Sequence, residues 1–461
     1  MTNDNLTEIR KWIEENFKEI KNVYFDLLKI PSISGNEKYF NDICRCSLFL
    51  KKIVDGVGLK TEIIDTETSP IVFGEYLSDK KDSKTLLIYG HYDVTDVAPI
   101  EDWLCDPFDP YIKDNQVFAR GALDNKGQLL YSIYAIKCLM DLYDKKLPIN
   151  IKICLEGEEE ATSYGLSKSL KNLKKKFRAD YLLVPDTDIP NKHTPAITLG
   201  LRGVAQMTVD IIGSNVDLHS GTHGGLAYNP LRAMVEMLSK IWDENGKILI
   251  DGFYEGVEDM KKDEMDNYFF DFDKELYSDT FGIKTFGGEK KYSELESNWL
   301  RPTIEINGIR GGSIGKEHKT VIPAKAHAKI SCRLVPNQDP KKIIDSIRKF
   351  FQNNVKKGMD VVVTSKAGGI AVRENADNVF AKAVSNAYTE VFGKKCKKIL
   401  SGGSIPIISD LKKELGVDIV MMGFGLAEDN MHGPNEHFGL DRFKDGILTV
   451  ARTIQILGKN I

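Results

Sequence analysis

Four short, mostly apolar runs stand out along the chain, at residues 86–89, 149–155, 181–184 and 419–422. Apolar runs without polar alternation are typical of parallel strands that are buried on both faces. Between them, the segment from Gly127 onward places its apolar residues at helical spacing, and strands alternate with helices from about residue 6 to residue 200. The pattern therefore predicts an α/β fold, with a mostly parallel sheet flanked by helices.

The pattern changes after residue 200. Strands are expected at 204–212, 303–306, 321–334 and 361–363, and helices at 231–241 and 343–351. The order β-α-β-β-α-β predicts a ferredoxin-like α+β domain. An acidic, aromatic segment, 250–300, shows neither the helical nor the strand period, and no element is assigned to it. We therefore expect a domain split into residues 1–200 and 368–461, with residues 201–367 inserted between its halves.

Every apolar run of the split domain leads to a residue type that binds metals. The runs lead to His91, to Glu158–Glu160, to Asp186 and to His432, and Asp124 stands at the head of the helix that follows the first run. Ligands of parallel α/β sheets bind beyond the carboxyl ends of the strands. The five positions are therefore expected to share one crevice. They predict a metal site, and a two-metal site because one carboxylate, such as Asp124, can bridge two cations.

Taken singly, these residues are ambiguous. Asp124 could simply cap a helix, and Glu158–Glu160 could be a solvated acidic loop. Near a cation, however, one of these glutamates could coordinate while a neighbour takes a proton from water. Asp93 lies two residues after His91, on the same side of the chain, where it could hold the second nitrogen of a metal-bound imidazole. The three-glutamate run leaves the register of base and ligand open by one residue.

Composition narrows the class of protein. A chain of 461 residues is expected to form two or more domains. A net charge of −4 does not indicate a positively charged surface that binds nucleic acid. No apolar stretch reaches the roughly 18 residues that span a bilayer. Seven cysteines without metal-finger spacing indicate reduced thiols. We expect a cytoplasmic protein without nucleic-acid or membrane partners.

Four motifs together carry a resemblance to a known family. They are Gly90-His91-Tyr92-Asp93 and the segments 121–127, 156–160 and 432–436. The set resembles the co-catalytic zinc metallopeptidases, the family of carnosine dipeptidases, cytosolic nonspecific dipeptidase, aminoacylase and glutamate carboxypeptidase. Further motifs at 200–203, 217–221, 319–323, 333–336 and 402–406 look most like the dipeptidase branch. The resemblance runs from about residue 29 to the C-terminus.

The resemblance implies a role for each matching residue. One divalent ion would be held by His91, Asp124 and Asp186, and a second by Asp124, Glu160 and His432. Glu159 would be the general base and Asp93 the support for His91. At the substrate, His219 would stabilise the oxyanion, and Thr320, Arg333 and Ser404 would hold the carboxylate end. The resemblance implies zinc, with manganese or cobalt as alternatives, because nitrogen and oxygen ligands suit all three and do not choose between them.

The activity implied is metal-dependent hydrolysis of the amide bond of dipeptides or short peptides. His219 would reach the site of a neighbouring subunit, so the inserted domain would serve as a lid and dimerisation domain of a homodimer. An N-acyl-amino-acid deacylase or a carboxypeptidase would use the same metal site and stays open. A non-catalytic binding protein on this fold is the alternative from another class.

Overall fold

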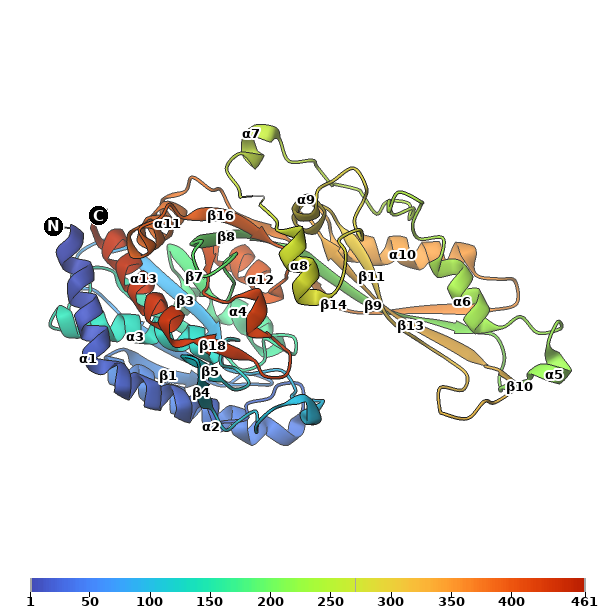
Figure 1. Ribbon diagram of the computed structural model, residues 1–461, viewed down its shortest axis with the longest axis horizontal. Helices are drawn as coiled ribbons and strands as arrows, with labels where there is room; N and C mark the ends of the chain where they lie inside the picture. The colour runs from blue at the N-terminus through green and yellow to red at the C-terminus, as the bar shows by residue number, and fades with distance from the viewer. Residues whose placement is uncertain (1, 270, 460–461) are drawn as a thin grey trace.

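The computed structural model describes residues 2–269 and 271–459. Two lobes lie side by side along the longest axis of the molecule (Figure 1). The larger lobe contains the N-terminal and C-terminal parts of the chain, and the smaller lobe is formed by its middle.

The larger lobe is built on a nine-stranded sheet. Its strands are β1 (Lys60–Ile64), β2 (Ile71–Tyr76), β3 (Thr85–His91), β6 (Asn150–Glu156), β7 (Tyr181–Pro185), β8 (Ala196–Leu201), β15 (Val372–Arg373), β16 (Lys397–Ser401) and β17 (Asp418–Met422). They follow the order β1-β2-β6-β3-β7-β17-β8-β15, and β16 also pairs with β8. The central strands β6, β3, β7 and β17 run parallel, as predicted. Antiparallel pairings of β1, β2 and β15 at the edges make the sheet mixed.

Helices cover both faces of this sheet. One face carries α1 (Thr2–Leu28), α2 (Phe40–Val57), α3 (Lys126–Leu142), α11 (Val379–Phe392) and α13 (Leu440–Lys459), and the other carries α4 (Tyr164–Phe177) and α12 (Pro406–Leu415). Along β3, Leu86 and Ile88 pack in the first core, whereas Leu87 and Tyr89 pack in the second. Successive side chains of a strand point to opposite faces, so burial of both faces requires the continuous apolar run seen in the sequence.

A small three-stranded sheet joins the two halves of the larger lobe. It consists of β4 (Tyr111–Lys113), β5 (Gln116–Phe118) and β18 (His437–Gly439), with β18 paired to β5. The loop before β18 is thereby brought to the loop after β5. These two loops carry His432 and Asp124.

The smaller lobe is ferredoxin-like, as expected. Its elements in chain order are β9 (Gly203–Ile212), α6 (Pro230–Leu238), β11 (Thr303–Arg310), β13 (Lys325–Leu334), α10 (Pro340–Asn354) and β14 (Asp360–Gly369). The antiparallel strands follow the order β11-β13-β9-β14, and α6 and α10 pack on the sheet over a core of their own.

The far tip of the smaller lobe is a short ribbon (Figure 1). It contains β10 (Leu218–His219), α5 (Ser220–His223) and β12 (Val321–Ile322), and β10 pairs with β12. The single strand expected at 321–334 is therefore interrupted at Pro323, where proline lacks the N–H that a strand ladder needs. The chain turns there from the ribbon into the main sheet.

The unassigned segment contains three short helices, α7 (Lys262–Met265), α8 (Lys274–Phe281) and α9 (Glu294–Trp299). Arg301 forms ion pairs with Asp259 and Glu289, two residues near opposite ends of this segment, and so holds its two ends together. The N–H of Phe269 donates to the carbonyl of Lys398 in β16 at 2.9 Å. The N–H of Lys290 donates to the carbonyl of Asn245 at 3.0 Å, so the segment is attached to the smaller lobe as well as to the larger one.

The chain passes between the sheets at two points. β8 ends at Leu201 and β9 begins at Gly203, whereas β14 ends at Gly369 and β15 begins at Val372. The domain boundaries expected at 200/201 and 367/368 lie close to these crossings and stay a prediction. No helix among the described residues is both long and apolar enough to cross a bilayer, and the seven cysteines are unpaired.

Candidate metal centre

His91 lies at the carboxyl end of β3 and is completely buried. Its Nδ1 is 3.1 Å from the carbonyl oxygen of Asp93 and 3.3 Å from the Asp93 carboxylate. Its Nε2 faces two other carboxylates, at 3.1 Å from Asp124 Oδ1 and 3.7 Å from Asp186 Oδ2. Asp93 therefore orients the ring so that Nε2 points into a group of carboxylates, as a metal-binding histidine requires.

Asp124 stands between two imidazoles. Its Oδ1 is 3.1 Å from His91 Nε2, and its Oδ2 is 2.7 Å from His432 Nε2. The N-cap of α3 is Asn125, so Asp124 does not cap the helix. Asn125 instead donates to Asp186 Oδ1 at 2.7 Å. The Asp124 carboxylate thus presents one oxygen to each imidazole, which is the geometry of a bridging ligand.

The three glutamates after β6 point in different directions. Glu158 turns away from the imidazoles and accepts the N–H of Gly165 at the start of α4. Glu160 Oε1 lies 2.9 Å from His432 Nε2. The backbone N–H groups of Glu159 and Glu160 donate to the two oxygens of Asp93, at 3.1 and 3.0 Å. The turn therefore leaves Glu159 and Glu160 on the side of the candidate centre.

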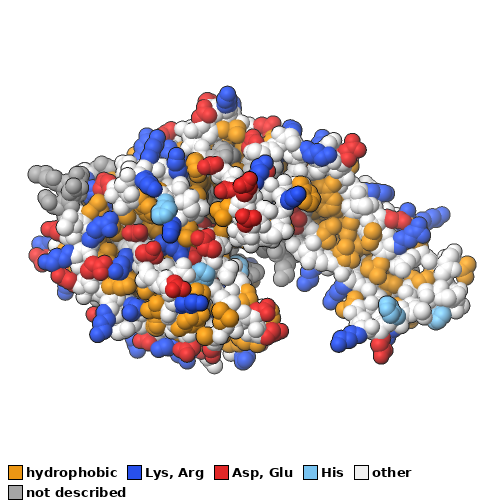
Figure 2. All heavy atoms as spheres, viewed as in Figure 1, with side chains coloured by type: hydrophobic (Ala, Val, Ile, Leu, Met, Phe, Trp, Pro, Cys, Tyr) orange, Lys and Arg blue, Asp and Glu red, His pale blue; other side chains and the backbone are white. Residues whose placement is uncertain are grey.

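His432 belongs to a loop with unusual backbone geometry. Its φ of 62° is in the left-handed region, which is uncommon outside glycine. Its side chain is 52% exposed, so the centre opens to solvent at this residue. The molecule is hollowed between the two lobes, with histidines on both lobes (Figure 2).

The carboxylates of the centre repel one another. Burial, followed by neighbouring charges such as Asp124, raises the pKa of Glu160 to about 7, and burial raises that of Asp186 to about 6. Burial also raises the pKa of Glu159 well above its usual value, although His91 opposes this. Only Asp124, which both imidazoles contact, has a lowered pKa despite its burial. Divalent cations would relieve this repulsion, so the residues present fit a metal centre.

Ligand atoms of His91, Asp124 and Glu160 lie within 4.8 Å of one another. Asp186 and His432 extend this group to either side through the contacts described above. The structure therefore brings together all five residues that were predicted to bind metal, together with Asp93. It places Glu159 beside them.

Metal affinity should rise steeply with pH. In the metal-free protein, carboxylate contacts from Asp124 and Glu160 raise the pKa of His432 to about 11, above the unfolded value of about 6.5. This imidazole therefore stabilises the metal-free fold below about pH 6.5, and the contribution is lost as pH rises through the folded value. A metal ligand must be deprotonated, so binding displaces this proton. We expect roughly tenfold tighter binding per pH unit between about pH 6 and 8 for each proton displaced.

Isothermal titration calorimetry in buffers of different ionisation enthalpy counts the protons released. Release of one proton or more per ion at pH 7 is the expected result. Binding without proton release would contradict the assignment of His432 as a ligand.

The residues predicted to bind substrate fall into two separate groups. His219 and Thr320 are exposed on the tip ribbon, with Thr320 Oγ1 3.4 Å from His219 Nε2. Arg333 and Ser404 lie where the chain crosses between the sheets, and Ser404 donates to the carbonyl oxygen of Arg202 at 2.5 Å. The described contacts connect neither group with the metal centre of the same chain.

Several residues of the centre were missed by the sequence interpretation. The carboxylate of Glu436 accepts hydrogen bonds around Asp124, and Arg120 contacts it. Glu156, at the end of β6, accepts from Tyr89 at 2.6 Å below the site. The position of Glu436 within the motif at 432–436 was a usable signal, but nothing in the sequence shows which donors its carboxylate meets.

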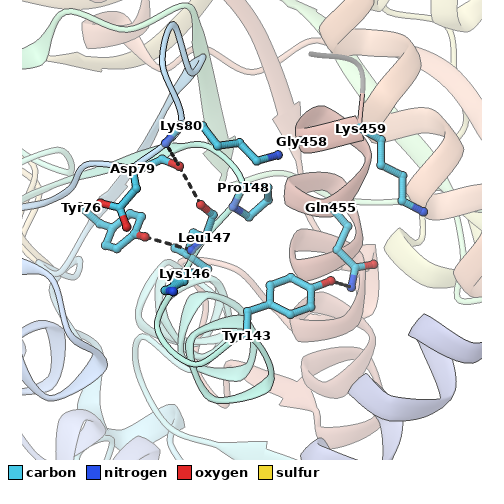
Figure 3. Close-up of a pocket in the computed structure, with 11 residues that line it drawn as sticks. Tyr76, Asp79, Lys80, Tyr143, Lys146, Leu147, Pro148, Gln455, Gly458 and Lys459 are labelled. Carbon is cyan, nitrogen blue, oxygen red and sulfur yellow. Dashed lines mark hydrogen bonds between the residues drawn. The ribbon is translucent and has the colours of Figure 1, made fainter.

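A cavity of about 410 Å³ lies away from these residues (Figure 3). It is lined by the ends of α3 and α13 and by the segment after β2, including Tyr143, Gln455 and Lys80. Gln455 donates to Tyr143 Oη at 2.8 Å across its wall. Its lining residues, all within the described part of the chain, include no histidine, so we assign the chemistry to the centre at β3.

Comparisons with known proteins find relatives over nearly the whole chain. Residues 87–456 match the family described as Peptidase family M20/M25/M40. The chain is 30% identical to the Cys-Gly metallodipeptidase DUG1 of Candida albicans, over 96% of each protein. It is 30% identical to human Beta-Ala-His dipeptidase, over 82% of this chain and 75% of that protein. The solved structure of the metallo-carboxypeptidase Sso-CP2 of Sulfolobus solfataricus has a TM-score of 0.87 at 30% identity, covering 96% of this chain and 99% of that one.

Proposed function

The chain belongs to peptidase family M20/M25/M40 and is a metallopeptidase, and we propose that it hydrolyses the amide bond of unblocked dipeptides at a centre of two divalent metal ions. The observation that carries the proposal is the position of Asp124, with one carboxylate oxygen toward His91 and the other toward His432. A bridging carboxylate between two sets of ligands is what a dinuclear centre needs.

His91, Asp124 and Asp186 would hold one ion, and Asp124, Glu160 and His432 the other. Nitrogen and oxygen donors without thiolate suit zinc, with manganese or cobalt as alternatives. When bound, the two ions would lower the pKa of a water molecule and polarise the substrate carbonyl.

Glu159 would be the general base. Its carboxylate lies among the buried charges of the centre, where the pKa is raised well above the usual value by burial first. Nearby cations would bring that pKa down toward neutral pH, the range that suits proton transfer. Glu159 would take the proton of the attacking water and return it to the leaving nitrogen. Asp93 would hold His91 and, through two backbone N–H groups, the turn that carries Glu159.

Arg333 would bind the carboxylate terminus of the substrate. Its guanidinium is half-buried, burial lowers its pKa, and it has no ion-pair partner among the described residues. The pKa of Arg202 is lowered to about 10, by burial first and then by the charge of Arg333. Two neighbouring cations in a partly buried position repel each other and favour a bound anion. Ser404, bonded to the Arg202 backbone, would shape the same subsite.

Asp188 supports a substrate with a free amino group. It follows Asp186 by two residues, and its backbone forms an isolated bridge with that of Gly425. Asp188 is accessible to solvent, but the surrounding protein and then the charge of Asp429 raise the pKa of its carboxyl to about 7. This carboxyl lies against Gly425, where any larger residue would collide with it. The ammonium group of a dipeptide would stabilise the ionised form of this carboxyl, whereas a neutral acyl group would not.

The protein would act as a homodimer. His219 Nδ1 accepts the N–H of Gly221 at 3.1 Å, so a neutral ring carries its proton on Nε2 and can donate it to a developing oxyanion. Because the tip ribbon lies far from the centre of its own chain (Figure 1), His219 and Thr320 would complete the site of a second copy. Residues 201–367 would then form the lid and dimerisation domain.

A panel of substrates tests the proposal and its alternatives. The metal-loaded protein should cleave unblocked dipeptides, such as Cys-Gly and β-Ala-His, faster than N-acetyl amino acids. Faster cleavage of N-acetyl amino acids would identify a deacylase. Stepwise trimming of longer peptides from the carboxyl end would identify a carboxypeptidase, which the similarity to Sso-CP2 keeps as the second candidate.

Replacement of Arg333 by alanine should lower kcat/KM for dipeptides by at least about tenfold, because a hydrogen bond to a charged group contributes roughly 1.5–3 kcal/mol. Amidation of the substrate's carboxyl end should impair the wild-type enzyme strongly and the Arg333→Ala variant little. Arg310→Ala, an exposed arginine of the same small sheet, is the matched control and should leave kcat/KM unchanged. Equal cleavage of free and amidated dipeptides by the wild type would remove Arg333 from this role.

A further inference from the structure

One buried ion pair connects the backbones of two candidate metal ligands. Arg120 Nη1 lies 2.8 Å from Glu436 Oε2, and the two side chains are 2% and 0% exposed. Arg120 follows β5 in the first half of the chain, whereas Glu436 precedes β18 in the last. The pair thus sits where the two halves of the larger lobe meet.

Both oxygens of Glu436 are used to shape the loop of Asp124. Oε2 accepts the N–H of Gly121 at 3.0 Å, and Oε1 accepts those of Leu123 and Asp124 at 2.9 and 3.0 Å. Three backbone donors and one guanidinium therefore converge on a single buried carboxylate. Such charge-assisted hydrogen bonds are stronger than neutral ones and define direction.

Arg120 extends the connection to His432. Its Nη2 donates to the carbonyl oxygen of His432 at 3.1 Å and to that of Asp96 at 3.2 Å. The guanidinium also stacks on Trp103, 5.1 Å from the ring centroid. His432 is half exposed and has a left-handed backbone, so few other contacts determine where its carbonyl lies.

Two of the three ligands of the other candidate ion, His91 and Asp186, are held independently of this pair. His91 is positioned by β3 and by Asp93, and Asp186 is held by the amide of Asn125. Of the candidate ligands, the ion pair contacts the backbones of the bridging Asp124 and of His432, and His432 belongs to one ion alone. Loss of the pair is therefore expected to affect one side of the centre more than the other.

We propose that Arg120 and Glu436 are positioning residues that set the distance between Asp124 and His432, and thereby the affinity for the ion held by Asp124, Glu160 and His432. This inference rests on the two-ion centre proposed above. It assigns the pair a selective effect: the ion held by His91, Asp124 and Asp186 stays tightly bound when the pair is broken.

The test counts ions in protein equilibrated against chelator-buffered Zn²⁺. The wild type should bind two ions. Glu436→Gln keeps one acceptor oxygen but loses the charge and the second acceptor, and should bind the second ion about 10- to 100-fold more weakly, the usual effect of losing a partner behind a metal ligand. At a free Zn²⁺ concentration that just saturates the wild type, this variant should hold one ion, and excess Zn²⁺ should restore the second.

Glu390→Gln is the matched control, because Glu390 pairs with the buried Arg452 between α11 and α13, away from the centre. It should lower the melting temperature and leave both ion affinities unchanged. Arg120→Lys provides a second variant in case Glu436→Gln does not fold. It keeps a positive charge beside Glu436 but has no second nitrogen to contact the His432 carbonyl, and should weaken the same ion.

The inference would be overturned if the variants bound both ions more weakly to the same degree. It would also be overturned if the folded variants bound the second ion as tightly as the wild type does. A wild type that binds fewer than two ions would instead overturn the dinuclear centre. Counting ions requires no substrate. Failure of the wild type to cleave dipeptides would therefore contradict the proposed function and leave the role of the ion pair standing.

Discussion

Replacing Glu159 with glutamine should lower kcat for dipeptides at least about a hundredfold, since general acid–base catalysis contributes roughly 10²–10⁴ in rate. Both metal ions should stay bound. Glutamine keeps the size and shape of the side chain but cannot accept the proton of the attacking water. The ligands Asp124, Glu160 and His432 are unchanged in this variant. Steady-state kinetics and metal content measured on the same preparation give both results.

Glu158→Gln is the control for this experiment. Glu158 points to the start of α4 and accepts the N–H of Gly165, so its replacement should affect stability and leave kcat nearly unchanged. If Glu159→Gln loses metal while Glu158→Gln keeps metal and loses activity, the order of base and ligand is shifted by one residue. That outcome would require the turn after β6 to differ from the one seen here.

Mixing two inactive chains should restore activity if His219 acts in the site of a partner. One chain carries His219→Ala and the other carries Glu159→Gln. In a mixed dimer with two-fold symmetry, one site combines an intact Glu159 with an intact His219 from the partner, and the other site lacks both. Random exchange of equal amounts makes half of the dimers mixed, so about a quarter of the wild-type activity should return.

The control mixes His219→Ala with a chain that carries both substitutions, where no site can be complete. Activity should then stay at the background level. A His219→Ala chain that is fully active, or a wild type that is fully active as a monomer in light scattering, would contradict the proposal that the two copies share their sites.

The architecture of the molecule could be predicted from its apolar periodicity. Strands such as β3 are buried on both faces, so each appears as an unbroken apolar run whose end is visible in the sequence. Because ligands collect at the ends of parallel strands, His91 and Asp186 could be placed together before their distance was known. The ferredoxin-like order followed from the same reasoning applied to half-buried strands and amphipathic helices.

The features that could not be predicted depend on contacts that the periodicity of the sequence does not contain. The segment around α8 buries little apolar surface of its own and contacts both lobes, so no period marks it. The direction of each glutamate in 158–160 depends on a turn, and only contacts such as that between Glu158 and Gly165 show it. The convergence of backbone donors on Glu436 joins residues more than 300 positions apart in the chain.

The most direct test of the dinuclear centre is a crystal structure of the zinc-loaded protein with anomalous scattering measured at the zinc edge. Two peaks about 3.5–4 Å apart are expected, one on each side of the Asp124 carboxylate, with His91 and Asp186 at one and His432 and Glu160 at the other. A single peak, or peaks that do not contact Asp124, would contradict a dinuclear centre bridged by this residue.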